Sequence, residues 1–225
     1  MDWPALRLSL ELAAATTAVL LLLGLPLAYW LAFSRFRLKF VVETVVALPL
    51  VLPPTVLGFY VLLAIGPRGP LGRVYETLTG SRLPFSFPGL LVASVLYSLP
   101  FAVQPFAAAI QAVDRRLIEA SWCLGESRLG TFFKVIAPLS LPGIVTGLVL
   151  SFAHTLGEFG VVLMVGGNLP GITRTVSIAI YDDVQALDYG SAGETSLLLL
   201  AVSFVVLAVT YGLNRRFSAA WPRHF

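Results

Sequence analysis

The chain is poor in charged residues. Only 12% of its 225 residues are Asp, Glu, Lys or Arg, whereas soluble globular proteins carry about 25%. Hydrophobic residues make up 57% of the chain, and the mean hydropathy is +0.87. This composition excludes an ordinary soluble domain and indicates a membrane protein.

Residues of catalytic and metal chemistry are also scarce. The chain has two histidines, His154 and His224, and one cysteine, Cys123. These residues cannot form a Cys/His metal cluster, and one cysteine cannot form an intramolecular disulfide. The sequence has no G-x-S-x-G nucleophile elbow and no G-x-x-x-x-G-K-[ST] phosphate loop. We therefore expect no enzyme activity, metal or cofactor in this chain. If ATP drives its action, ATP and Mg²⁺ must bind to a partner polypeptide.

Five long stretches contain no charged residue at their centres. Each is long enough to cross about 30 Å of hydrocarbon as a helix, which takes roughly 20 residues. Backbone groups in lipid must be paired within the segment, and these runs lack the alternation of a barrel strand. The sequence therefore predicts an all-α, polytopic membrane protein with one transmembrane domain, residues 1–225. The predicted helices are 10–33, 42–65, 88–112, 139–166 and 195–214.

The first apolar run has an alternative interpretation as a secretory signal peptide. Its apolar core is longer than the usual hydrophobic region of such a peptide, and Asp2 and Glu11 counter a positive amino-terminal region. We therefore expect a retained helix.

The distribution of Lys and Arg predicts the orientation. Ten of the fifteen lie in segments 34–41, 113–138 and 215–225. The other five lie in segments 1–9, 66–87 and 167–194. Positive residues favour the cytoplasmic side, so we expect the N-terminus outside and the C-terminus in the cytoplasm. The net charge of +3 then reflects topology, and we expect no nucleic-acid partner because no basic–aromatic pattern occurs.

A charged loop, residues 113–138, separates the third and fourth predicted helices. Gly125 and Gly130 interrupt it, so we expect two short helices, about 114–124 and 127–137, the second ending at Pro138. Charged and large apolar residues alternate along the loop. This pattern is typical of a docking surface for a soluble partner. An amphipathic anchor at the membrane surface and a simple connector remain alternatives.

The charged loop resembles the EAA loop of ATP-binding-cassette (ABC) importer permeases. The family pattern is E-A-A, three residues, G, nine residues and I-x-L-P. The chain follows this spacing with Glu119-Ala120-Ser121, Gly125 and Val135-Ile136-Ala137-Pro138. The departures are Ser121, Val135 and Ala137. The resemblance implies that the loop forms coupling helices that dock on an ATPase subunit. The coupling residues it implies are Arg115, Glu119, Ala120, Ser121, Gly125, Val135 and Pro138.

Further segments resemble the molybdate permeases of such importers. These are LPLVLPPTVLG (48–58), HTLGEFG (154–160), GGNLPGITRT (166–175) and AIY (179–181). The resemblance implies a permease subunit that imports molybdate, or tungstate, across the bacterial inner membrane. The partners it implies are a second copy of the chain, ABC ATPase subunits, and a periplasmic or lipid-anchored molybdate-binding protein.

Two alternative functions stay open. Sulfate/thiosulfate permeases share variants of the GEFG and N-x-P-G-x-T segments, so a sulfate importer is the first alternative. A self-contained channel or secondary transporter is the second, although such proteins more often show internal repeats and intramembrane relays of ionisable residues.

The prolines and polar residues of the predicted helices suggest where the solute crosses. Pro53, Pro54, Pro100 and Pro105 bend helices and free backbone groups, although proline is also commoner in membrane helices generally. The predicted helices contain no Lys or Arg, so we expect a weakly polar path of hydroxyl and amide groups. The candidates for the path or its gate are Pro53, Pro54, Thr55, Ser98, Gln104, Thr155 and Glu158.

Glu158 is the one charged residue well inside a predicted helix, where insertion of an acid costs on the order of 3 kcal/mol. A bare carboxylate repels a dianion, so we do not expect it to be a ligand. It is either a gate element or a structural hydrogen-bonding residue.

Overall fold

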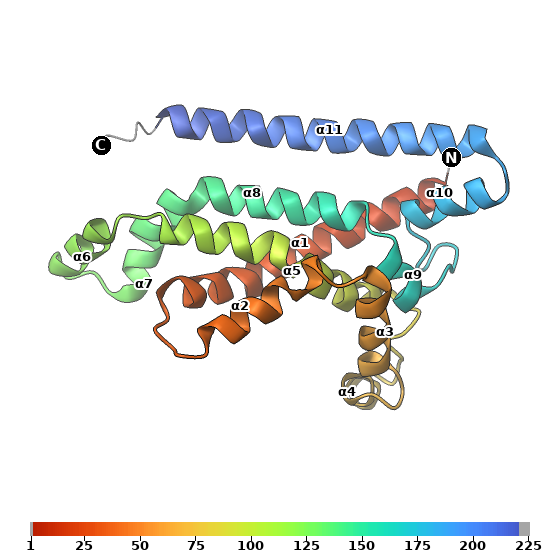
Figure 1. Cartoon of the computed structure of the whole chain (residues 1–225), viewed down its shortest axis with the longest axis horizontal. Coiled ribbons are helices and arrows are strands. Elements are labelled where there is room, and N and C mark those ends of the chain that lie inside the picture. Colours follow the sequence, from red (N-terminus) through yellow and green to blue (C-terminus); the bar gives the residue numbers. More distant parts are fainter. Residues whose placement is uncertain (1, 221–225) are drawn as a thin grey trace.

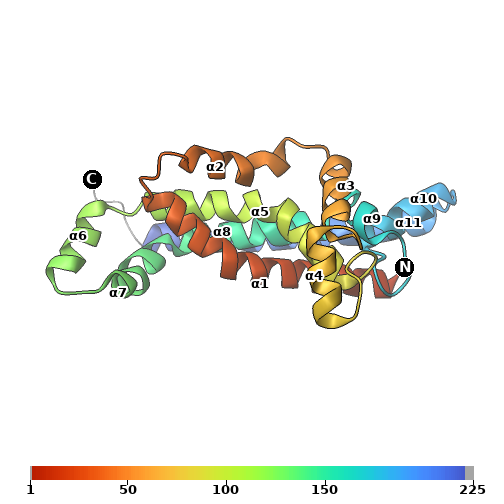
Figure 2. The ribbon, with the colours of Figure 1, turned by 90° about the horizontal axis from the view of Figure 1, so that it is seen from below.

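Three long helices form the centre of the bundle. The structure, a computed structural model, describes residues 2–220, among which there are helices and loops but no strand. Helices α1 (Trp3–Phe33), α5 (Phe87–Gln111) and α8 (Ala137–Leu156) pack side by side (Figures 1 and 2). The all-α prediction is confirmed.

Small residues allow the central helices to approach closely. Phe106 of α5 is fully buried and fills the space beside Gly147 of α8, where an added Cβ would lie 2.7 Å from its ring. One added at Gly143 would lie 2.3 Å from Ala109. Van der Waals packing over small residues is the usual way in which membrane helices associate.

Four continuous helices are long and apolar enough to cross a membrane: Trp3–Phe33, Phe87–Gln111, Arg128–Leu156 and Tyr189–Gly212. The first begins before the predicted residue 10 because the Asp2 side chain accepts a hydrogen bond from the Ala5 amide at 3.0 Å. The last, α11 (Tyr189–Ala220), likewise follows an acidic cap, since Asp188 accepts from the Ser191 amide at 3.1 Å. That backbone hydrogen bond lowers the pKa of the Asp188 carboxyl from its usual value.

The second predicted helix, 42–65, is wrong as a single straight element. Helix α2 (Lys39–Ala47) continues into the short 3₁₀ turn η1 (Leu48–Leu50), and after a break α3 (Pro54–Ile65) leaves at 114° to them. Pro53 is extended (φ −55°, ψ 136°), because a residue that precedes proline avoids the helical region, and Pro54 then opens α3. Figure 1 shows α3 turned across the bundle. Counted as one element, α2, η1 and α3 would bring the number of apolar spans in the described residues to five; as a re-entrant loop they would leave it at four.

The fourth predicted helix, 139–166, is displaced toward the charged loop. Helix α7 (Arg128–Thr131) runs through a π turn, η2 (Phe132–Ile136), directly into α8. The predicted stop at Pro138 is therefore wrong. The Ala137 amide donates to the Phe132 carbonyl five residues back, and this widened turn accommodates a proline ring that would otherwise collide with the preceding turn.

At the other end of α8, Gly157 ends the helix, and a separate helix α9 (Gly160–Gly166) follows. Two further short helices, α4 (Pro70–Thr79) and α10 (Val176–Gln185), lie near this end of the bundle. Helix α6 (Arg115–Cys123) and α7 lie at one end of the bundle, and α9, α10 and the N-terminus lie at the other (Figure 1). Arg223 and His224, which entered the sequence argument, lie outside the described residues.

Candidate functional site

The helix pair α6–α7 projects from one end of the bundle with a mixed charged and apolar surface. The Asp114 carboxylate caps α6 by accepting from the Arg116 amide at 2.8 Å. Within α6 only Ile118 and Ser121 are buried. The exposed large apolar side chains of the pair are Leu117, Trp122, Leu124 and Leu129. Exposed apolar side chains beside solvated charges are typical of an interaction surface.

Gly125 ends α6 in a Schellman motif. The Gly125 amide donates to the Trp122 carbonyl at 3.0 Å, and the Glu126 amide donates to the Ser121 carbonyl at 3.1 Å. The φ of Gly125 is +86°, a left-handed conformation that other residues adopt only with strain. The glycine of the EAA resemblance therefore sets the direction in which the chain leaves α6.

Ser121 joins α6 to α7. Its hydroxyl lies 3.0 Å from the Thr131 hydroxyl, and both side chains are buried. An ion pair between Lys134 and Glu126 adds a second link at the surface. In the sequence Ser121 appeared only as a departure from the alanine of the EAA pattern. The hydroxyl of Thr131, ten residues later, was the one feature that could have suggested this pairing.

The remaining coupling candidates fall into two places. Arg115, Glu119 and Ala120 are exposed on α6, where Arg115 Nε lies 3.2 Å from Glu119 Oε1. Val135 lies in the π turn, and Pro138 lies at the start of α8. A hollow of about 370 Å³ opens beside Trp122, Glu126, Ser127 and Arg128. The role of these residues in coupling stays a prediction.

The two breaks in the apolar spans pack against each other. Pro54 lies against Gly160, where an added Cβ would be 2.7 Å from the proline Cβ. One turn on, Gly58 of α3 lies against Met164 of α9, where an added Cβ would be 2.8 Å away. Pro53 and Thr55 are exposed at the bend. The PLVLPP and GEFG segments, far apart in sequence, thus meet.

Ser98 and Thr155 are buried and bond to each other. The Ser98 hydroxyl of α5 lies 2.8 Å from the Thr155 hydroxyl and 2.9 Å from His154 Nδ1, both of α8. These two hydroxyls were expected to line a path. In the structure they support His154, a residue that the list of candidates did not include.

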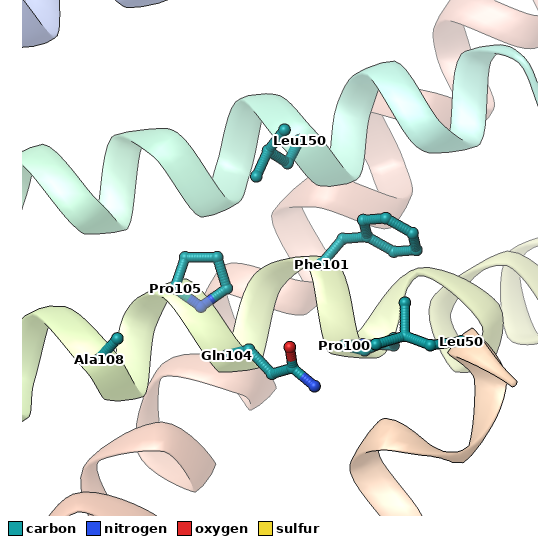
Figure 3. A pocket seen from close by; sticks show the side chains of 7 residues that line it. All are labelled: Leu50, Pro100, Phe101, Gln104, Pro105, Ala108 and Leu150. Carbon is teal, nitrogen blue, oxygen red and sulfur yellow. The ribbon is translucent and has the colours of Figure 1, made fainter.

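Gln104 lines an open hollow over α5, here called the α5 groove, with a volume of about 330 Å³. Figure 3 shows Gln104 on α5 with Leu150 of α8 and Leu50 of η1 to either side. Its lining residues are Leu50, Pro100, Phe101, Gln104, Pro105, Ala108 and Leu150. None of them is charged, and the amide of Gln104 is the one polar side chain among them. The place of Gln104 in a path stays a prediction.

Glu158 lies in the break between α8 and α9, not inside a helix as expected, because Gly157 ends α8. Its side chain is buried, with 4% of the residue exposed. Neither carboxyl oxygen has a hydrogen-bond partner among the described residues, and the buried Ser94 hydroxyl of α5 also lacks one. The role of Glu158, as a gate element or as a structural residue, stays a prediction.

Arg174, which the sequence analysis used only as part of a motif, ties the α9–α10 loop to the start of α1. Its guanidinium lies 3.4 Å from the Asp2 carboxylate and 3.3 Å from the Asp182 carboxylate. Asn168 also donates to Asp182 at 2.7 Å, and the Val176 amide donates to Ser9 at 2.8 Å. The GGNLPGITRT segment therefore builds the end of the bundle opposite to α6 and α7.

Curated relatives match this chain over most of their length. The molybdenum transport system permease protein ModB of Azotobacter vinelandii is 52% identical over 218 residues, which cover 97% of this chain and 96% of the relative. The ModB protein of Escherichia coli K12 is 35% identical over 92% of this chain and 90% of its own length. A probable sulfate transport system permease protein, cysT of Zygnema circumcarinatum, is 34% identical over 88% of this chain and 69% of its own.

Solved structures share the fold. A bacterial alginate ABC transporter, in complex with an alginate-pentasaccharide-bound periplasmic protein, superposes with a TM-score of 0.77 at 18% identity, over 96% of this chain and 78% of that chain. The MetNI methionine ABC transporter superposes with a TM-score of 0.70 at 16% identity, over 94% of each chain. The fold is thus that of an ABC importer permease.

The profile of the family described as "binding-protein-dependent transport system inner membrane component" matches residues 24–219. With several apolar helices, relatives that are transport permeases and this match over most of its length, the chain is a multi-pass membrane protein that belongs to the family of binding-protein-dependent transport system inner membrane components.

Proposed function

We propose that this chain is the membrane permease subunit of an ATP-driven importer of molybdate or tungstate in the bacterial inner membrane. The similarity to relatives named as molybdenum transport permeases, over nearly the whole chain, supports this substrate. The α5 groove, with an amide and no charged side chain, is consistent with a path that releases a dianion instead of holding it.

The connection of the charged loop to the central helices carries the proposal. Helix α6 begins four residues after the end of α5, and α7 passes without interruption into α8. Movement of α6 and α7 would therefore reach the two helices that flank the α5 groove. We propose that an ABC ATPase subunit docks on this loop through the coupling residues named above, and that ATP and Mg²⁺ bind on that subunit.

The other partners follow from the same arrangement. The α5 groove is open along one chain, and α11 exposes Leu200, Phe204 and Val205, so a second copy would cover apolar surface and enclose a path. The excess of Lys and Arg near the charged loop supports its placement in the cytoplasm, with the N-terminus outside. A periplasmic or lipid-anchored binding protein would then deliver the anion at the end formed by α9 and α10. The whole chain would act as one transmembrane domain.

Reconstitution tests this proposal. The chain is co-expressed with a candidate ABC ATPase and a candidate molybdate-binding protein, and uptake of radioactive molybdate is measured in proteoliposomes. We expect uptake that needs all three proteins and ATP, with strong competition by tungstate and weak competition by sulfate. Uptake without the ATPase would instead support a channel or secondary transporter.

The sulfate importer remains the second candidate, because the relative named as a sulfate permease is 34% identical. Stronger competition by sulfate than by tungstate would favour it over molybdate.

A further inference from the structure

His154 is held rigidly between two helices. Its imidazole stacks on the Phe101 ring with a centroid distance of 3.9 Å and an interplanar angle of 24°. On another side the Tyr97 ring lies with its centroid at 4.8 Å. Both aromatic rings belong to α5, whereas His154 lies in the last turn of α8. The ring plane of His154 is therefore fixed by packing.

One nitrogen of this ring is occupied and the other is free. Nδ1 lies 2.9 Å from the Ser98 hydroxyl, which is buried and also contacts Thr155. Within the described part of the chain, Nε2 has no hydrogen-bond partner, and the residue is partly exposed. The rest of the ring is thus anchored, and Nε2 is left for a ligand.

The hydroxyl pair influences which nitrogen carries the proton. When Thr155 donates to Ser98, Ser98 donates to Nδ1, and the neutral ring then carries its proton on Nε2. When Ser98 instead accepts from Nδ1–H, Nε2 bears a proton only in the imidazolium form. An anion meets an N–H at Nε2 in the neutral Nε2–H tautomer and in the imidazolium, but not in the neutral Nδ1–H tautomer. An approaching anion therefore favours the first two states.

His154 does not line the α5 groove itself, but it adjoins residues that do. Phe101 both stacks on His154 and lines the groove, and Leu150, one turn before His154, lines it too. Neither α5 nor α8 contains Lys or Arg between residues 87–111 and 137–156. Beside the amide of Gln104 and the hydroxyl of Tyr97, Nε2–H is therefore a side-chain donor that this region can offer to an anion.

We propose that His154 contacts the transported oxyanion, with Nε2–H donating to one of its oxygens, and that Ser98 is a positioning residue that holds the proton on Nε2. This inference rests on the proposed function and names a residue of its pathway. A single neutral donor provides a short-lived contact that a fixed positive charge would not. In a dimer two such donors, one from each copy, would face the path.

Substitutions that move or remove the donor test the proposal. In glutamine the amide nitrogen reaches about the position of Nε2, and in asparagine it reaches only that of Nδ1. His154→Phe keeps the stacking and removes both nitrogens. In proteoliposomes with the ATPase and binding protein, we expect His154→Gln to keep uptake within about threefold of wild type. Loss of a hydrogen bond to a charged group predicts a fall of roughly tenfold or more for His154→Asn and His154→Phe.

The outcomes separate this inference from a packing role. Equal uptake by the Gln and Asn variants, or wild-type uptake by the Phe variant, would overturn it. ATPase activity stimulated by the binding protein reports whether each variant assembles. If His154→Phe does not assemble, the comparison of Gln with Asn decides alone, because both are polar and smaller than the ring.

A spectroscopic measurement tests the role of Ser98. The chain has two histidines, so ¹⁵N-histidine labelling of a His224→Asn background gives one imidazole signal in the complex with unlabelled partners. We expect the Nε2–H tautomer in the wild type and a mixture of tautomers in Ser98→Ala, with uptake reduced severalfold. An unchanged tautomer and unchanged uptake in Ser98→Ala would refute the positioning role.

The proposed function can fail independently. If the wild-type complex carries sulfate in place of molybdate, or needs no ATPase, the function proposed above is wrong. The order of the His154 variants is then measured on the anion that does cross, and it still decides whether Nε2 contacts that anion.

Discussion

Substitution of Gly125 by alanine isolates the backbone at the end of α6. The φ of Gly125 is +86°, and an added Cβ would meet no atom within 4 Å. The change therefore introduces backbone strain without a clash, at about 1–2 kcal/mol for an L-residue in this region. That strain disfavours the observed exit from α6 by a factor of roughly 5 to 30. We expect Gly125→Ala to weaken binding of the ATPase subunit and to reduce ATP-driven uptake.

Gly80 provides a matched control. It ends α4 with a φ of +69°, and an added Cβ there would also meet no atom within 4 Å. Gly80→Ala should therefore lower thermal stability by a similar amount while leaving ATPase binding unchanged. Asparagine tolerates positive φ, so Gly125→Asn should recover much of the binding. ATPase affinity is measured by titration against the purified chain in nanodiscs. If Gly80→Ala weakens ATPase binding as much as Gly125→Ala, or if Gly125→Ala binds as wild type, the argument fails.

Three further predictions concern packing and charge, each read by thermal denaturation in detergent. Ser121→Ala leaves the buried Thr131 hydroxyl without its partner and should cost about 1–3 kcal/mol of stability. Most of this loss should be recovered in the double variant Ser121→Ala/Thr131→Val, and additive losses in the double-mutant cycle would contradict the pairing. Gly147→Ala forces a Cβ to within 2.7 Å of the Phe106 ring and should cost about 1–3 kcal/mol of stability. The control Gly193→Ala, whose Cβ meets no atom within 4 Å, should not destabilise the protein, and equal losses in the two variants would contradict the packing argument. Arg174→Ala removes contacts to Asp2 and Asp182 and should cost about 1 kcal/mol at low salt. The cost should be smaller in high salt, because salt already weakens these ion pairs in the wild type. An unchanged midpoint at low salt would show the pairs to be unimportant.

The sequence predicted the apolar spans well and their interruptions poorly. Absence of charge marks where a chain can cross lipid. The five predicted segments accordingly correspond to four continuous apolar helices and one bent pair of helices. It does not mark where a helix turns. The 114° bend before Pro54 and the break at Gly157 depend on local backbone chemistry and on the packing of Pro54 against Gly160. Pro138 was expected to end a helix, but a widened turn before it allows the helix to continue.

The candidate site shows the same division. The spacing of Glu119 and Gly125 indicated that the charged loop is the candidate docking site. In the structure Glu119 lies on α6 and Gly125 lies just after its end, because both positions depend on local sequence. The link between Ser98 and His154 joins residues 56 positions apart, and no periodicity within either helix reports such a pair. In the sequence His154 therefore stood out only as one of two histidines and as the first residue of the HTLGEFG segment.

The unbroken passage from α7 through the π turn into α8 has a mechanical consequence. The helix Arg128–Leu156 has 29 residues, so this rod is about 43 Å long. A tilt of about 10° about the α7 end of this helix would move its opposite end through about 7.5 Å, by the geometry of a stiff rod of that length. The tip carries His154 and the Gly157 break. Under the proposed docking on α6 and α7, a small displacement of that end of the helix would thus become a larger displacement at the opposite end of the bundle.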